Sequence, residues 1–259
     1  MSPKLGTRPD PEPREPPRCS RFWTPRRRRG VQKREHFGRQ SGGVDFDEAR
    51  GRVLGLLERG DPSSASGRRR VLLGIAGAPG AGKTTLAERL VTAVRDDGRY
   101  RAAHVPMDGF HLADVELDRL GRRDRKGALD TFDGWGYRAL LQRLRDRPDE
   151  PVYAPGFERV LEQPVAASIA VGPEVDLVVS EGNWLLVDGP PWRDAAALLD
   201  EVWFADAPLA VRRARLVARH VAFGKPPAAA AAWVEAVDLP NAEAIEPGRD
   251  RADAVVVTG

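Results

Sequence analysis

The hydrophobic positions of this chain fall into two kinds of segment. Short, apolar and largely β-branched runs predict buried strands, at 71–76, 99–107, 176–180, 201–205 and 254–257. Stretches with apolar residues at helical spacing predict helices, at 45–59, from Gly82 onwards, and at 113–121, 134–146, 208–223 and 226–237. Strands that alternate with helices favour an α/β fold, in which a mostly parallel sheet carries helices on both faces.

Residues 151–164 interrupt this alternation. Their sequence, PVYAPGFERVLEQP, contains too many prolines and aromatic residues for a helix. We therefore expect a short excursion of β structure at this point of the chain.

A glycine-rich loop separates the strand at 71–76 from the helix that follows it. Its sequence, GAPGAGKT, fills the pattern G-x-x-x-x-G-K-[ST] with Gly77, Gly82, Lys83 and Thr84. Glycines let the backbone wrap a phosphate with its N–H groups pointing inward, and the start of the helix adds the positive end of its dipole. Because a strand precedes the loop and a helix follows it, we favour nucleoside triphosphate binding over a glycine-rich turn that happens to carry Lys-Thr.

Basic charge is concentrated at the N-terminal end of the chain. The formal net charge is +3, but residues 1–44 contain RRRR at 26–29 and many other basic residues, so the remainder is near neutral. This segment has few aliphatic residues and is predicted to be a disordered basic tail before a single domain at 45–259, with 60–67 as a linker inside that domain. Two alternatives stay open: an upstream start codon, and an electrostatic arm for nucleic acid or another acidic surface.

Other features of the composition narrow the class of protein. The single cysteine, Cys19, excludes an intramolecular disulfide and a cysteine-rich metal site. No apolar run approaches membrane-spanning length, and the N-terminal arginines lack the apolar segment of an export signal. We expect a cytoplasmic protein with no membrane partner, and nucleic-acid binding only through the tail.

Acidic residues follow two more of the predicted strands. Asp108 follows the strand at 99–107, and Glu181 follows the strand at 176–180. Ligands of open parallel sheets bind outside the carboxyl ends of the strands, so both side chains are expected near the glycine-rich loop. Asp108 would accept the proton of an attacking hydroxyl or, alternatively, cap a turn. Glu181 would hold Mg²⁺ or, alternatively, be a solvated loop acid.

The predicted helix at 208–223 is rich in arginine. Arg212, Arg215 and Arg219 are spaced i, i+3, i+7 and share one face. Such a face would stabilise a phosphoryl group in transfer if the helix acts as a lid, and a solvated basic face would explain the same spacing. The chain has no N-K-x-D element of the kind that guanine-selective switches usually carry, which weighs against a GTPase.

Five stretches in this order, GIAGAPGAGKTTLA, PMDGFH, RKGALDTFD, PVYAPGFER and DLVVSEGNWLL, resemble the phosphoribulokinase/uridine kinase/pantothenate kinase family of P-loop kinases. The resemblance extends from about Val71 to the C-terminus. It implies a three-layer P-loop NTPase fold with a helical lid, and an enzyme that uses ATP and Mg²⁺. By this resemblance Asp108 matches the catalytic aspartate, Glu181 the Walker B glutamate, and Arg215 and Arg219 the lid arginines.

The motifs resemble kinases with different acceptors. The stretches 108–110 and 125–127 look like pantothenate kinases, whereas 151–159 looks like the nucleoside-facing hairpin of uridine kinases. The combination, with Asn241, is most similar to a bacterial branch described as nucleoside/nucleotide kinases or fructose-transport-associated kinases. We expect a nucleoside-like acceptor first, then a pantothenate-like compound, then a sugar.

The expected site residues follow from these arguments and from the resemblance. The ATP-binding residues are Gly77, Ala78, Pro79, Gly80, Ala81, Gly82, Lys83, Thr84 and Thr85, and the Mg²⁺ ligands are Thr84 and Glu181. The catalytic residues are Asp108, Lys83, Arg215 and Arg219, and the acceptor is expected at Asp108, Phe110, His111, Arg125, Tyr153, Phe157, Arg159 and Trp184. A non-catalytic ATP-dependent switch or chaperone is the alternative of another class, and a homo-oligomer is left open.

Overall fold

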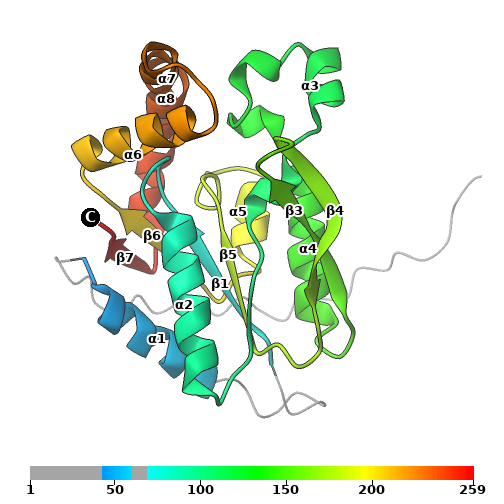
Figure 1. Ribbon diagram of the computed structural model, residues 1–259. Coiled ribbons are helices and arrows are strands. Elements are labelled where there is room, and N and C mark those ends of the chain that lie inside the picture. The colour runs from blue at the N-terminus through cyan, green and yellow to red at the C-terminus, as the bar shows by residue number, and fades with distance from the viewer. Residues whose placement is uncertain (1–42, 60–68) are drawn as a thin grey trace, which may run out of the picture. The chain divides into compact units, whose positions relative to one another are not determined.

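A parallel sheet of five strands, in the order β2-β5-β1-β6-β7, forms the centre of the domain (Figure 1). The computed structural model describes residues 43–59 and 69–259. The strands are β1 (Val71–Ala76), β2 (Ala102–His104), β5 (Leu177–Glu181), β6 (Glu201–Asp206) and β7 (Ala254–Val257). All four pairings between neighbouring strands are parallel, which confirms the predicted α/β fold.

Helices cover both faces of this sheet. They are α1 (Phe46–Glu58), α2 (Lys83–Asp97), α3 (Asp114–Leu120), α4 (Gly134–Asp146), α5 (Trp192–Ala196), α6 (Leu209–Ala222), α7 (Pro227–Trp233) and α8 (Leu239–Ile245). Successive residues of β1 point to opposite faces: Leu72 packs with residues of α4 and α5, and Leu73 packs with residues of α1 and α2. A strand that is buried on both faces explains the unbroken apolar run at 71–76.

A separate antiparallel hairpin forms where the sequence predicted a short excursion of β structure. It consists of β3 (Val152–Glu158) and β4 (Gln163–Val171), and its register shifts between Ala154 and Gly156. The hairpin packs closely on the 3-10 turn η1 (Met107–Phe110), because a Cβ atom at Gly109 would lie only 2.2 Å from the carbonyl oxygen of Pro155. The hairpin is thereby held against the loop that carries Asp108.

Two predicted elements differ from the structure. The strand expected at 99–107 is limited to β2. At its carboxyl end Val105 still donates to Val179 O (2.9 Å), but Pro106 has no N–H to continue the pairing. The helix expected at 226–237 ends as α7 at Trp233 and continues through a π-helical turn, Val234–Asp238, into α8.

The predicted linker at 60–67 and all but the last two residues of the predicted tail at 1–44 fall on parts of the chain that the structure does not describe. Residues 1–42 and 60–68 lie outside the described residues. Val44 pairs with β7, since its N–H donates to Val255 O (2.8 Å) and its carbonyl accepts from Val257 N (3.0 Å). In the described segments 43–59 and 69–259, no helix has both the length and the apolar character needed to cross a membrane.

Candidate active site

The glycine-rich loop between β1 and α2 depends on glycine where it approaches other elements. Gly77 has φ +148°, and a Cβ atom there would lie 2.5 Å from Ala205 O of β6. Gly80 has φ +75°, and a Cβ atom there would lie 2.7 Å from Arg212 O of α6. Both values of φ fall in the region that only glycine adopts readily. The loop therefore packs against β6 and against the arginine-rich helix.

Lys83 begins α2 and its side chain is buried beneath the loop. Its Nζ donates a hydrogen bond to Ala78 O (3.0 Å). Burial lowers the pKa of Lys83 to about 8, although Glu181 and Asp108 act in the opposite direction. The ammonium group therefore remains mainly protonated at neutral pH and can bind a phosphate.

Thr84 and Glu181 form a pair of oxygen atoms at the end of β5. Thr84 Oγ1 donates to Glu181 Oε1 over 3.0 Å. Burial, followed by the charge of Asp108, raises the pKa of Glu181 to about 7. A hydroxyl beside a carboxylate is a donor set that suits Mg²⁺. Among the described residues, no three His, Cys, Asp or Glu side chains form a metal site, so Mg²⁺ here would rely on phosphate and water for its other ligands.

Asp108 lies on η1, which closely follows β2, the strand at one edge of the sheet. Arg159 Nη2 donates to Asp108 Oδ2 over 2.6 Å, and the carbonyl oxygen of Asp108 is 2.8 Å from His111 Nδ1. Burial acts to raise the pKa of Asp108, but His111, Arg159 and Lys83 outweigh it and the pKa is lowered. Asp108 is therefore a carboxylate at neutral pH, which is the form that can accept a proton.

Two cavities meet at these side chains. The lid cavity, of about 360 Å³, extends from the glycine-rich loop to α6 and the π-helical turn on one side and to α3 on the other. The hairpin cavity, of about 410 Å³, lies between α2, the end of β2 and the hairpin. Both are lined by Thr84, Asp108, Phe157, Arg159 and Glu181. The two acids and the threonine can therefore act on a ligand in either cavity.

Comparison with known proteins identifies the family. No family model matches the chain. "Putative uridine kinase C227.14" of Schizosaccharomyces pombe is 35% identical over 184 residues, which cover 69% of this chain and 75% of that protein. The crystal structure of a "putative fructose transport system kinase" from Silicibacter sp. TM1040 has a TM-score of 0.71 and 40% identity, and the match covers 81% of this chain and 98% of that one. The chain belongs to the phosphoribulokinase/uridine kinase/pantothenate kinase family of P-loop kinases.

A further relative of this P-loop kinase supports the same class of reaction. "ATP-dependent kinase-like protein notR'" of Aspergillus versicolor is 40% identical over 152 residues, which cover 55% of this chain and 88% of that protein. The names of these relatives support a phosphotransferase.

The structure brings only some of the residues expected to bind an acceptor to the two cavities. Asp108, His111, Phe157 and Arg159 line the lid cavity, whereas four other expected residues lie elsewhere, namely Phe110, Arg125, Tyr153 and Trp184.

Each of these four side chains has another environment. Phe110 is buried edge-on against Tyr137, and Trp184 is buried and donates to Gly127 O (3.3 Å). Tyr153 is 55% exposed on β3, and Arg125 pairs with Asp130 (2.9 Å). They support the walls of the site or lie on the surface.

The three arginines of α6 that the sequence singled out differ in what they contact. Arg219 lines the lid cavity, whereas Arg215 donates to Thr258 O (2.9 Å) and, over 3.5 Å, to Gly80 O. Arg212 donates through Nε to Ala207 O (3.1 Å), and its buried Nη1 has no hydrogen-bond partner in the part of the chain that the structure describes. Of these three arginines, only Arg219 lines either of the two cavities.

Several cavity residues were not singled out from the sequence. Lys126 and Asn183 line the lid cavity, and each lies within a motif that the sequence did show, RKG and EGNW. His220 Nε2 lies 2.8 Å from Asp238 Oδ2, and both residues line the same cavity. No pattern in the sequence predicts that pair, because a π-helical turn brings Asp238 to His220.

Proposed function

We propose that this P-loop kinase transfers the γ-phosphoryl group of ATP to a hydroxyl group of a small, nucleoside-like metabolite. The observation that carries the proposal is that two cavities meet at Thr84, Asp108 and Glu181. An ionised aspartate, a pair of oxygen atoms suited to Mg²⁺ and the buried lysine of the loop all line the lid cavity. These are the groups that phosphoryl transfer to an alcohol requires.

The donor would be held by the loop and its flanking side chains. The loop amides and the start of α2 would bind the phosphates, and Lys83 would reach the β- and γ-phosphates. Thr84 and Glu181 would hold Mg²⁺, which when bound neutralises charge on the phosphate oxygens. Arg219, from α6, would stabilise the charge on the phosphoryl group during transfer. Arg215 would instead link the loop to the C-terminal residues, through its bonds to Gly80 O and Thr258 O.

The acceptor hydroxyl would be activated by Asp108. The acceptor oxygen would bond to the γ-phosphorus, and the bond between that phosphorus and the β,γ-bridging oxygen would break. The hydroxyl proton would pass to the Asp108 carboxylate. ADP leaves with the bridging oxygen. Because the pKa of Asp108 is lowered, this residue acts mainly by accepting the proton as the new bond forms rather than before it.

An aromatic wall supports a nucleoside-like acceptor. The ring of His111 lies 4.0 Å from that of Phe132 and 5.0 Å from that of Phe157, measured between ring centres. All three rings line the lid cavity, and such a wall suits a planar base.

A pantothenate-like acceptor is the second candidate, supported by the cations on the same side of the cavity. Arg123, Lys126 and Arg159 line it, and together they could bind a carboxylate. A sugar ranks third.

ATP consumption by the purified protein against nucleosides, pantothenate and sugars tests the proposal, with Asp108→Asn alongside. We expect one acceptor class to stimulate turnover, and we expect Asp108→Asn to abolish that turnover while ATP binding persists. Slow hydrolysis that no acceptor and no substitution changes would instead favour an ATP-dependent switch.

A further inference from the structure

The side chain expected to act as the base is occupied by a residue of the hairpin. Arg159 directly follows β3, and its Nη2 donates to Asp108 Oδ2 over 2.6 Å. The guanidinium also lies over the ring of Phe157, 4.8 Å from its centre. Both partners keep contact with solvent, since the Arg159 side chain is 44% exposed and that of Asp108 is 27% exposed. The ion pair is thus formed at the junction of the cavities, where it can also be broken.

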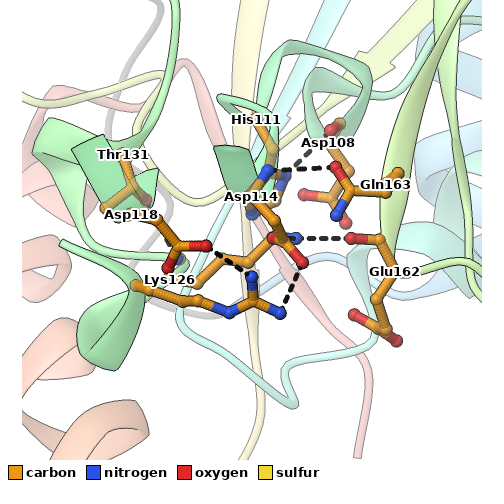
Figure 2. Close-up of polar contacts among 10 residues, drawn as sticks. Asp108, His111, Asp114, Asp118, Lys126, Thr131, Glu162 and Gln163 are labelled. Atoms are coloured by element: carbon orange, nitrogen blue, oxygen red, sulfur yellow. Dashed lines mark hydrogen bonds and ion pairs between the residues drawn. The ribbon is translucent and has the colours of Figure 1, made fainter. Parts of the chain in front are cut away.

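The part of the hairpin that carries Arg159 is fixed by contacts to the α3 region, drawn in Figure 2. Lys126 Nζ donates to Asp114 Oδ1 (2.7 Å) and to the carbonyl oxygen of Glu162. Gln163 Oε1 accepts from the backbone N–H of Asp114 (3.1 Å). These bonds hold the end of the hairpin turn where β4 begins, three and four residues after Arg159.

A carboxylate in this ion pair is a poor base. One of its oxygens already accepts a charge-assisted hydrogen bond, and the neighbouring guanidinium stabilises the ionised form. Water is small enough to reach Asp108 without moving Arg159. It would then meet a carboxylate whose charge is balanced by Arg159. The guanidinium lies over the ring of Phe157, which lines both cavities. An acceptor bound against this ring would therefore take the place of the guanidinium.

We propose that Arg159 withholds Asp108 from water and releases it when an acceptor occupies the site, so that it selects the acceptor hydroxyl over water. This inference rests on the proposed kinase function. The reaction that it suppresses is hydrolysis. In that reaction the water oxygen bonds to the γ-phosphorus, a water proton passes to Asp108, and the bond to the β,γ-bridging oxygen breaks to give ADP and inorganic phosphate. Arg159 is therefore a specificity residue for the transfer.

Phosphate release from Mg·ATP without any acceptor tests this role. In the full chain, Arg159→Gln is expected to raise that rate by about 10- to 100-fold, the effect of freeing a base from one charge-assisted hydrogen bond. Arg159→Lys is expected to give a smaller increase, because it keeps the charge but loses the planar guanidinium that lies over Phe157. Arg147→Gln is the matched control, since Arg147 pairs with Glu150 on the surface (2.9 Å) away from both cavities and is expected to change nothing.

The double variant Asp108→Asn/Arg159→Gln distinguishes the mechanism from a general loosening of the site. It is expected to lose the increase, because the freed base is then absent. An increase that persists in the double variant would overturn the inference, and so would an unchanged or lower rate in Arg159→Gln. Binding of a fluorescent ATP analogue is measured in parallel: variants that bind it yet show no increase refute the role of Arg159 alone, whereas a wild-type protein that does not bind it refutes the proposed kinase and this role together.

Discussion

Asp108 and Glu181 are two carboxyl groups of one site whose surroundings shift their pKa values in opposite directions. Glu181 is buried and faces the charge of Asp108, so its pKa rises to about 7. Asp108 is surrounded by His111, Arg159 and Lys83, which keep its pKa below the usual value despite burial. Neighbouring acids with separated pKa values are typical of sites in which the two have different roles. Here they suit a metal ligand and a base.

Removing the charge of Glu181 tests its role as a metal ligand. Glu181→Gln keeps the shape of the side chain but gives a weaker ligand for Mg²⁺. We expect the Mg²⁺ concentration for half-maximal turnover to rise by about tenfold or more, the effect usual for loss of one charged ligand interaction. Titration of activity with Mg²⁺ measures this, with the exposed Glu150→Gln as control. An unchanged Mg²⁺ dependence would contradict the assignment.

Ser180, next to Glu181, belongs to a buried hydrogen-bond chain that links β5 to Val105 and α4. Its Oγ donates to Val105 O (2.6 Å) and lies 2.8 Å from the hydroxyl of Tyr137. Ser180→Ala would leave two buried groups without their partner, and we expect a loss of about 1–3 kcal/mol in the free energy of unfolding. Urea unfolding gives the value. Tyr137→Phe removes only the outer member of the chain, so a larger loss for Tyr137→Phe than for Ser180→Ala would refute this account.

At the scale of elements, the contact between the hairpin and η1 sets the position of the base. Gly109 lets the carbonyl of Pro155 approach to a distance that no side chain would permit. The register shift between Ala154 and Gly156 lies at this contact. The hairpin and the turn therefore form a single support for Asp108 and Arg159.

Gly109→Ala is expected to push these two elements apart. The new Cβ atom would meet backbone, at 2.2 Å from Pro155 O, and backbone cannot rotate away as a side chain can. We expect about 1–3 kcal/mol of destabilisation, as for other overpacked sites, together with a fall in turnover. Thermal unfolding and ATP turnover measure both. Gly51→Ala on α1 is the control, because no atom lies within 4 Å of the new Cβ atom there and the variant is expected to be as stable or slightly more so.

The elements show which features of a sequence predict structure and which do not. The buried strands at 71–76 and 201–205 were predictable because a parallel strand covered on both faces needs an apolar run, here 71–76 and 202–205. The shortening of β2 depends on Pro106, which the apolar pattern alone conceals. The π-helical turn at Val234–Asp238, whose Asp238 pairs with His220 of α6, leaves no local signal in the sequence.

At the scale of the whole molecule, the described domain contains every residue assigned to the reaction. Its two hydrophobic clusters lie on opposite faces of one sheet, and Val44 pairs with β7 at the sheet edge. The sequence alone could place the loop, Asp108 and Glu181 together, because parallel strands present their carboxyl ends at one edge. It could not separate Lys126 from Arg125 as a cavity residue, because the side chain that faces the cavity depends on the turns at 123–131.

A variant that starts at Gly43 tests whether residues 1–42 contribute to nucleotide binding. We expect its affinity for an ATP analogue to equal that of the full chain, since the described domain carries the whole proposed site. Equilibrium binding measures this. Salt-dependent binding of nucleic acid by the full chain that is absent from the shorter variant would instead support the electrostatic role of the basic segment.

The hydrogen bond from Lys83 to Ala78 O gives the loop a ligand of its own. In the proposed reaction, Lys83 would exchange this oxygen for a phosphate oxygen when a triphosphate binds, and would return to Ala78 O when ADP leaves. The empty loop therefore never leaves a buried ammonium group without an acceptor, which would cost about 1–3 kcal/mol or more. Under the proposed function, we expect this exchange to lower the affinity for nucleotide and to ease the release of product. The same bond that stabilises the empty loop would thus favour rapid turnover over tight nucleotide binding.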